Sequence, residues 1–190
     1  MTTISEIEFC VLNGAHLKKM ATIEEIGSAV GLDPANVASV LDAAAASGMV
    51  MNLEGKHLLL PDGTNAVHDY YRTAYMPMRT NALLLAWYDR FEIINEQFIK
   101  LVSDWQSTEG DERIQGRLMK TVERLMKNLE EIVLKIPRYQ IYVRRFADSI
   151  AFVDSGNKDY VCKPTIDSIH NVWFEFHEDI LSVLGRPRDT

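Results

Sequence analysis

The sequence has few of the residues that mark several large classes of protein. Its two cysteines, Cys10 and Cys162, lie far apart and outside any Cys-x-x-Cys or Cys/His ligand spacing, so the sequence indicates neither a disulfide framework nor a structural zinc site. No stretch approaches the ~20 apolar residues that span a bilayer, and Glu6 and Glu8 interrupt the apolar positions near the start. We therefore expect a cytoplasmic protein with no membrane association, no metal and no cofactor.

Positive charge is also scarce. The 190 residues carry a formal net charge of -7, and the isoelectric point is near 5.2. Residues 1–67 hold eight acidic side chains and only three basic ones, Lys18, Lys19 and Lys56. Because Lys and Arg supply most of the affinity for nucleic acid by neutralising phosphates, this composition disfavours DNA as a partner.

The signatures of common enzyme classes are missing as well. The sequence has no G-x-S-x-G motif, no glycine-rich loop that would hold a phosphate, and no set of Cys, His and Asn residues typical of a thiol nucleophile. We therefore expect a non-enzymatic protein. An enzyme that uses His170 or His177 with Glu178 as acid–base groups is the weakest alternative.

The first third of the chain does contain a closely spaced series of helix start and stop signals. Residues 3–18 carry apolar side chains at helical spacing. Thr22 begins a T-x-x-E capping pattern with Glu25, which predicts the start of a second helix, and Gly31 is placed to end it. Asp33, followed directly by a proline, is then a typical N-cap of a third helix.

Two short runs of strand-forming residues follow this third helix. They cover residues 49–53 and 56–60 and are joined by Glu54 and Gly55, a pair typical of a tight hairpin turn. Helices followed by a hairpin in this order predict a winged helix-turn-helix over residues 1–69.

Beyond an expected connection at residues 70–78, the pattern changes to long amphipathic helices. Apolar residues recur at helical spacing with broad apolar faces, and short polar or proline-containing segments separate the runs. The predicted helices cover residues 79–105, 112–136, 137–152 and 164–184, with a polar loop at 107–111. Four antiparallel helices with short loops predict a helical bundle over residues 79–190, so the expected fold class is mainly α with a small hairpin.

The helix that would enter a DNA groove, residues 33–47, contains no Lys or Arg. If DNA were nevertheless bound, the contacts would fall to Asn36 and Ser39 on this helix and to Lys56 and His57 on the hairpin. We therefore expect the winged helix to serve as a packing or docking module.

The last predicted helix carries unusual polar residues on its apolar side. We take as candidate ligand-binding residues two histidines, their neighbouring carboxylates, a tryptophan and two arginines: Asp167, His170, Trp173, His177, Glu178, Arg138 and Arg145. Half-buried imidazoles beside carboxylates titrate near neutrality, and two arginines seven residues apart on one helix face would bind a small anion. The alternative is a satisfied polar network that fixes helix packing. The histidines lie two turns, ~10 Å, apart along a helix, so we expect no shared metal.

Several segments resemble a known family. They are AWYDRF at 86–91, DWQ at 104–106, the Arg138–Tyr139 pair and DSIHNVWFEFHEDILSVLGRPR at 167–188. Together they resemble the carboxy-terminal region of actinobacterial phosphoenolpyruvate-utilising, pyruvate phosphate dikinase-like mobile-domain proteins, while residues 4–63 resemble MarR-like winged helices. The resemblance implies association with such an enzyme system, or a small-molecule or protein contact shared with it. It does not imply phosphotransfer, because the phosphoryl-carrying histidine of the mobile domain belongs to a segment that this sequence lacks.

These observations favour a protein-interaction or ligand-responsive regulatory module. Its expected partner is another protein or a second copy of the chain, with a small anionic ligand as a further expectation. The alternative is a MarR-like transcriptional regulator that presents basic residues from elsewhere in a dimer.

Overall fold

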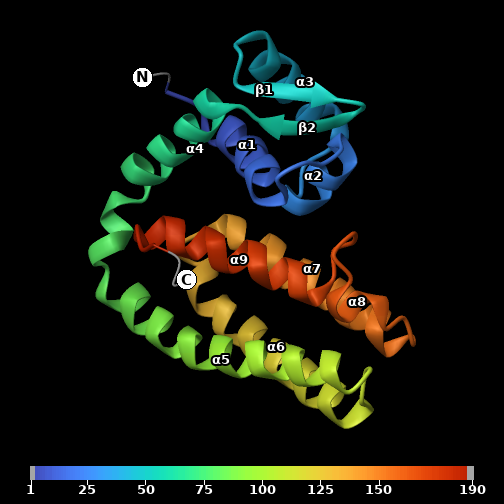
Figure 1. Cartoon of the computed structure of the whole chain (residues 1–190). Helices are drawn as coiled ribbons and strands as arrows, with labels where there is room; N and C mark the ends of the chain where they lie inside the picture. The colour runs from blue at the N-terminus through green and yellow to red at the C-terminus, as the bar shows by residue number, and fades with distance from the viewer. Residues whose placement is uncertain (1–2, 188–190) are drawn as a thin grey trace. The chain divides into compact units, whose positions relative to one another are not determined.

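The computed structural model describes residues 3–187 of the chain. The protein is mainly helical, with one two-stranded antiparallel hairpin (Figure 1). Clustering of contacts divides it into two compact units, one formed by residues up to Arg79 together with those from His177, the other by Thr80–Phe176. The boundary between units therefore falls within the C-terminal helix α9 (Ile169–Leu184).

The first helices of the chain begin at hydrogen-bonded caps. Helix α1 (Glu6–Lys18) starts at Ser5, and helix α2 (Ile23–Val30) starts at Thr22. In the second cap the Glu25 N–H donates to Thr22 Oγ1 at 3.2 Å and the Thr22 N–H donates to Glu25 Oε2 at 2.8 Å. The capping box predicted at this position is confirmed.

The junction between α2 and helix α3 (Pro34–Ala46) also has the predicted chemistry. Gly31 ends α2 in the left-handed conformation, at φ 73°. Asp33 accepts a hydrogen bond from the Ala35 N–H at 2.8 Å, and Pro34 occupies the first turn of α3. These residues satisfy backbone groups that a helix end leaves free.

Strands β1 (Val50–Leu53) and β2 (Lys56–Leu59) form the hairpin, with Leu53 opposite Lys56. Glu54 and Gly55 both have positive φ, 53° and 84°, as a tight two-residue turn of the primed type requires. The hairpin is joined to the segment between α1 and α2 by two backbone hydrogen bonds between Ala21 and His57, at 3.1 and 2.7 Å.

Helix α4 (Pro61–Ala74) was not predicted, and it occupies part of the segment that the sequence suggested as a connection. A short 3-10 helix, η1 (Met76–Thr80), follows it. Contacts with α1 hold α4 in place: the Phe9 ring stacks on Tyr70 with centroids 4.0 Å apart and meets Tyr71 edge-on at 4.9 Å. Such packing stabilises a helix whose own sequence has a weak helical signal.

The second unit is built from helices packed around aromatic side chains. Its first members are α5 (Ala82–Ser107) and α6 (Glu112–Val133), joined by the predicted polar loop. A short 3-10 helix η2 (Pro137–Tyr139) then leads into α7 (Gln140–Asp154), and a four-residue helix α8 (Asp159–Cys162), which was not predicted, follows.

The C-terminal helix begins later than the sequence suggested, at Ile169 instead of Pro164. The Asn171 side chain explains the difference, because its Nδ2 donates to the carbonyls of Lys163, Pro164 and Ile166 at 3.1, 2.9 and 2.7 Å. These bonds fix residues 163–168 as a turn ahead of the helix.

Candidate functional site

The solvent-facing side of α3 carries small residues and one acidic side chain, Asp42. Val37, Leu41 and Ala44 point into the core, with at most 3% exposure, while Asn36 and Ser39 are exposed. Neither end of α3 carries a basic residue. The two residues expected to reach DNA bases are therefore accessible, but no cation on this helix would hold a phosphate beside them.

His57, the other expected phosphate contact on the hairpin besides Lys56, is buried. Its side chain is 4% exposed, and its Nε2 lies 3.0 Å from Asn52 Nδ2. Asn52 Oδ1 already accepts a hydrogen bond from the Gly55 N–H at 3.0 Å, so the amide nitrogen faces the imidazole. The prediction for His57 is wrong because strand alternation points its ring inward; Lys56 remains exposed.

Arg145 is the centre of a buried charged cluster in the second unit. Its side chain is 4% exposed; Nε donates to Asp167 Oδ2 at 3.0 Å and Nη2 lies 2.7 Å from Glu175 Oε2. Burial alone would lower the pKa of Arg145, but the charges of Glu175 and then Asp167 raise it above its ordinary value. The guanidinium is therefore permanently charged and already held by two carboxylates.

The same cluster fixes the turn before α9. Ser149, one helical turn after Arg145 on α7, donates its hydroxyl to the Asp167 carbonyl at 2.7 Å. Asp167 is thus held through its side chain and its backbone. Glu175 was not among the predicted site residues. The sequence does place this carboxylate on the apolar side of the last helix, and a carboxylate that is buried there needs a cation as its partner.

Trp173 belongs to the hydrophobic core. It is 3% exposed, its ring stacks on Phe98 with centroids 3.7 Å apart, and its Nε1 donates to Asn95 Oδ1 at 2.9 Å. A tryptophan packed and hydrogen-bonded in this way has no surface left for a ligand.

Arg138 and Arg145 lie in successive helical segments and not in one α-helix as predicted. Arg138 lies in η2, before α7 begins, and its guanidinium carbon is 4.8 Å from the centroid of the Tyr139 ring. Pro137 is the first residue of this short 3-10 segment. Arg145 already pairs with Asp167 and Glu175, so an anionic ligand would compete with these carboxylates for it.

The candidate histidines on α9 fall into different units. His170 belongs to the unit of Arg145, whereas His177 and Glu178 belong to the unit of α1 and α4. All three are half-buried. Burial lowers the pKa of His170, so its imidazole is neutral near neutral pH. The candidate residues are thus divided between the two units, with Asp167, His170, Trp173, Arg138 and Arg145 in one and His177 and Glu178 in the other.

The structure places two further groups of polar side chains on α1 that sequence reasoning missed. Asn13 is buried and links two partners, accepting from the Tyr71 hydroxyl at 2.9 Å and donating to Asp179 Oδ2 at 3.2 Å. His16 meets the His68 ring edge-on with centroids 5.4 Å apart. Burial, followed by the charges of Lys19 and His68, lowers the pKa of His16 to about 4.

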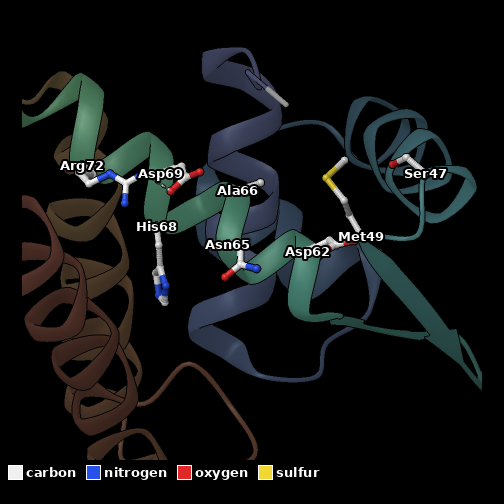
Figure 2. Close-up of a pocket in the computed structure, with 8 residues that line it drawn as sticks. All are labelled: Ser47, Met49, Asp62, Asn65, Ala66, His68, Asp69 and Arg72. Atoms are coloured by element: carbon white, nitrogen blue, oxygen red, sulfur yellow. Dashed lines mark hydrogen bonds and ion pairs between the residues drawn. The ribbon is translucent and has the colours of Figure 1, made fainter. Parts of the chain in front are cut away.

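A hollow of about 650 Å³ runs along α4 and was also missed. Figure 2 shows side chains that leave α4 in succession along its length, with Ser47 and Met49 at the end near the hairpin and His68 extending in another direction. Helix α4 was not predicted, so the sequence did not indicate that its polar residues lie on one side of a helix. The residues on α4 are Asp62, Asn65, Ala66, His68, Asp69 and Arg72.

Between residues 3 and 187 no group of three His, Cys, Asp or Glu side chains is arranged to hold a metal ion. Nor is any helix in that range both long and apolar enough to cross a membrane. Comparison of the chain with protein-family models, curated proteins and solved structures finds no match.

Proposed function

We propose that residues 3–79 form a winged helix that works as a protein-docking module, and that the chain is a non-enzymatic regulatory protein in which a bundle of about four helices forms the second part. The order of α1, α2, α3, hairpin and α4 supports the winged-helix interpretation. The resemblance in sequence suggests a phosphoenolpyruvate-utilising enzyme as the associated system.

The observation that carries this proposal is the missing cation on the surface of α3. Among the residues that the sequence marked as DNA contacts, only Lys56 offers a positive charge, since His57 is buried. For one phosphate contact, the logarithm of the binding constant falls by about 0.9 for each unit rise in the logarithm of the salt concentration. A fourfold rise in salt would therefore weaken binding only about fourfold. Proteins that make six to ten such contacts lose roughly a thousandfold or more over the same range.

The cluster around Arg145 supports a structural role for the candidate ligand residues. Arg145 and Trp173 are at most 4% exposed and have their partners within the protein. A ligand would have to displace a buried carboxylate or open the core. The polar-network alternative therefore explains these residues better than the anionic-ligand expectation.

The test is fluorescence anisotropy of a labelled mixed-sequence DNA duplex titrated with the full chain at low and high salt. We expect no salt-dependent binding by the natural sequence. A variant with Asn36→Arg, Ser39→Arg and Asp42→Lys adds four positive charges to α3 and should bind DNA with a steep salt dependence, because a winged helix presents this face to DNA.

A matched control adds the same charge elsewhere through Asp89→Lys and Glu96→Arg, two exposed positions on α5. It should bind far more weakly than the α3 variant. Binding by the natural chain at low salt that is lost at high salt would instead favour the MarR-like regulator. Equal binding by the two charged variants would contradict the winged-helix interpretation.

Docking through α3 has its own test in the self-association of the chain. The exposed Ala43 and Ala46 let another surface approach α3 closely. If the partner is a second copy, sedimentation velocity should detect a dimer, and Ala43→Arg should shift the equilibrium towards monomer while Ala82→Arg on α5 should not. A monomer at all concentrations would leave a different protein as the partner under this proposal.

A further inference from the structure

Helix α6 carries a row of exposed cations on its outer side. Of the six charged residues from Arg113 to Lys127, five are basic, although the whole chain has a net charge of -7. The five follow one another at alternating intervals of four and three residues, which places them in a single line about 21 Å long on an α-helix. We call this line the basic ridge; its members are Arg113, Arg117, Lys120, Arg124 and Lys127, and all five are exposed.

The cations of the basic ridge are not neutralised within the protein. Among residues 3–187 none of them forms an ion pair, and the only hydrogen bond from their side chains runs from Arg124 Nη2 to the neutral Gln97 Oε1 at 2.5 Å. Glu131, one turn beyond the ridge, is bound by Arg90 of α5 at 2.6 Å. Like charges three and four residues apart on a helix repel one another, so an anionic partner on the ridge would remove an unfavourable interaction.

Helix α5 lies beside α6 and adds an apolar group next to the ridge (Figure 1). Ile93 is 68% exposed. It follows Arg90 by three residues and precedes Gln97 by four, so it lies on the same side of α5 as both. Those two residues contact α6, at Glu131 and Arg124. A large apolar side chain surrounded by charged and polar groups is the usual composition of a protein-binding surface.

Gly116 leaves the backbone of α6 open beside the ridge. It follows Arg113 by three residues and precedes Lys120 by four, and a Cβ on it would meet no atom within 4 Å. Glycine disfavours the interior of a helix, and no contact of the described fold requires it at this position. The missing side chain lets another chain approach α6 closely between two of the ridge cations.

The ridge fits a narrow partner better than a broad polyanion. An acidic edge borders it about a quarter turn around α6. The edge consists of three exposed residues eleven and seven positions apart, Glu112, Glu123 and Glu130. A nucleic-acid duplex would bring phosphates against these carboxylates as well as against the cations, and the net charge of the chain repels a polyanion at long range. A single acidic helix can contact the ridge without covering the acidic edge.

We propose that the basic ridge and Ile93 bind an acidic amphipathic helix of a partner protein. The carboxylates of this helix follow the same alternating spacing of four and three residues, and an apolar side chain beside them packs on Ile93. The ridge lies in the unit Thr80–Phe176 and α3 lies in the other unit. The proposal therefore adds a second docking surface and does not depend on the partner of α3.

The test is fluorescence anisotropy of labelled probes titrated with the full chain at low salt. The matched peptide is an alanine-based helix with five glutamates at alternating intervals of four and three residues and a leucine on the adjoining side. The rearranged peptide has the same composition with its glutamates spread around the helix, and a mixed-sequence DNA duplex is the third probe. We expect the matched peptide to bind at least about fivefold more tightly than the other two probes, and to bind less tightly as salt is raised.

Variants locate the site on the protein. Arg117→Gln combined with Lys120→Gln should weaken binding of the matched peptide about five- to tenfold, and Ile93→Ser about threefold or more. The control pair Arg144→Gln and Lys163→Gln removes the same charge from exposed positions outside α5 and α6 and should leave the affinity within about twofold of the natural value. All five side chains are exposed, so the urea unfolding midpoint should stay close to that of the natural chain.

Gly116→Leu gives an independent check, because it fills the open position while replacing glycine by a better helix former. It should weaken binding of the matched peptide without lowering the urea midpoint. Four results would overturn the proposal: no binding of the matched peptide, equal affinity for the two peptides, tighter binding of the DNA duplex, or a loss in the control pair as large as in the ridge pair.

Discussion

Replacing Arg145 by methionine tests whether the charged cluster on α7 and α9 is structural. The change removes a cation that is 4% exposed and leaves Glu175, 8% exposed, with a buried carboxylate that has lost this ion pair. Breaking one side of a buried ion pair costs about 3–5 kcal/mol, because the remaining charge stays desolvated. The more exposed Asp167 adds little to this cost, since its side chain is 29% exposed.

The assay is urea unfolding followed by tryptophan fluorescence. All three tryptophans, Trp87, Trp105 and Trp173, lie in the unit that contains Arg145, so the signal reports on this unit. With a denaturant slope of about 2 kcal/mol per molar, the midpoint should fall by roughly 2 M.

Two further variants make the result specific to the ion pair. Arg144→Met alters the exposed neighbour on the same helix and should change the free energy of unfolding by less than about 0.5 kcal/mol. Combining Arg145→Met with Glu175→Leu should recover most of the loss, because no buried charge remains. A loss below about 1 kcal/mol for Arg145→Met alone would refute the reasoning and return Arg145 to the list of ligand residues.

Two other predictions concern the first unit. The pKa of His16 is about 4 in the folded protein and near 6.5 in the unfolded chain, so the unfolded chain binds a proton more readily. The free energy of unfolding should therefore fall as the pH drops from about 6.5 to about 4. The full shift would be worth about 3.4 kcal/mol, and solvent screening of the partly exposed ring reduces it to about 1–2 kcal/mol. Urea unfolding followed by circular dichroism measures this pH dependence. His16→Gln should remove it, whereas His68→Gln should retain most of it. An unchanged pH profile in His16→Gln would contradict the assignment to His16. Gly63→Ala should lower the free energy of unfolding by about 1–3 kcal/mol, because the added Cβ would meet the Met49 carbonyl. Gly116→Ala in α6 has open space around it and should raise the free energy of unfolding by about 0.5–1 kcal/mol. Equal effects of the two changes would disprove the close approach at Gly63.

Local signals explain what the sequence predicted well. The Thr22–Glu25 capping box, Gly31 and the Asp33 cap act through bonds between residues a few positions apart, so their geometry can be inferred without the rest of the fold. The hairpin turn at Glu54–Gly55 is local in the same sense.

The elements that were missed depend on contacts between distant residues. Helix α4 begins with Pro61 and a glycine among polar residues, and its helical form is supported by Tyr70 and Tyr71 packing on Phe9 of α1. The late start of α9 likewise depends on the three carbonyls that the Asn171 side chain bonds. Neither effect follows from the periodicity of apolar residues, because both require knowledge of which segments meet.

The candidate ligand residues show a related limit of sequence reasoning about charge. An arginine on a largely apolar helix suggests an anion site only if the fold leaves it without a carboxylate. Arg145 instead meets Asp167, 22 positions further along the chain, and Glu175 on α9. One cation with two carboxylates carries a net charge of -1, so an added anion would increase the repulsion in a buried cluster.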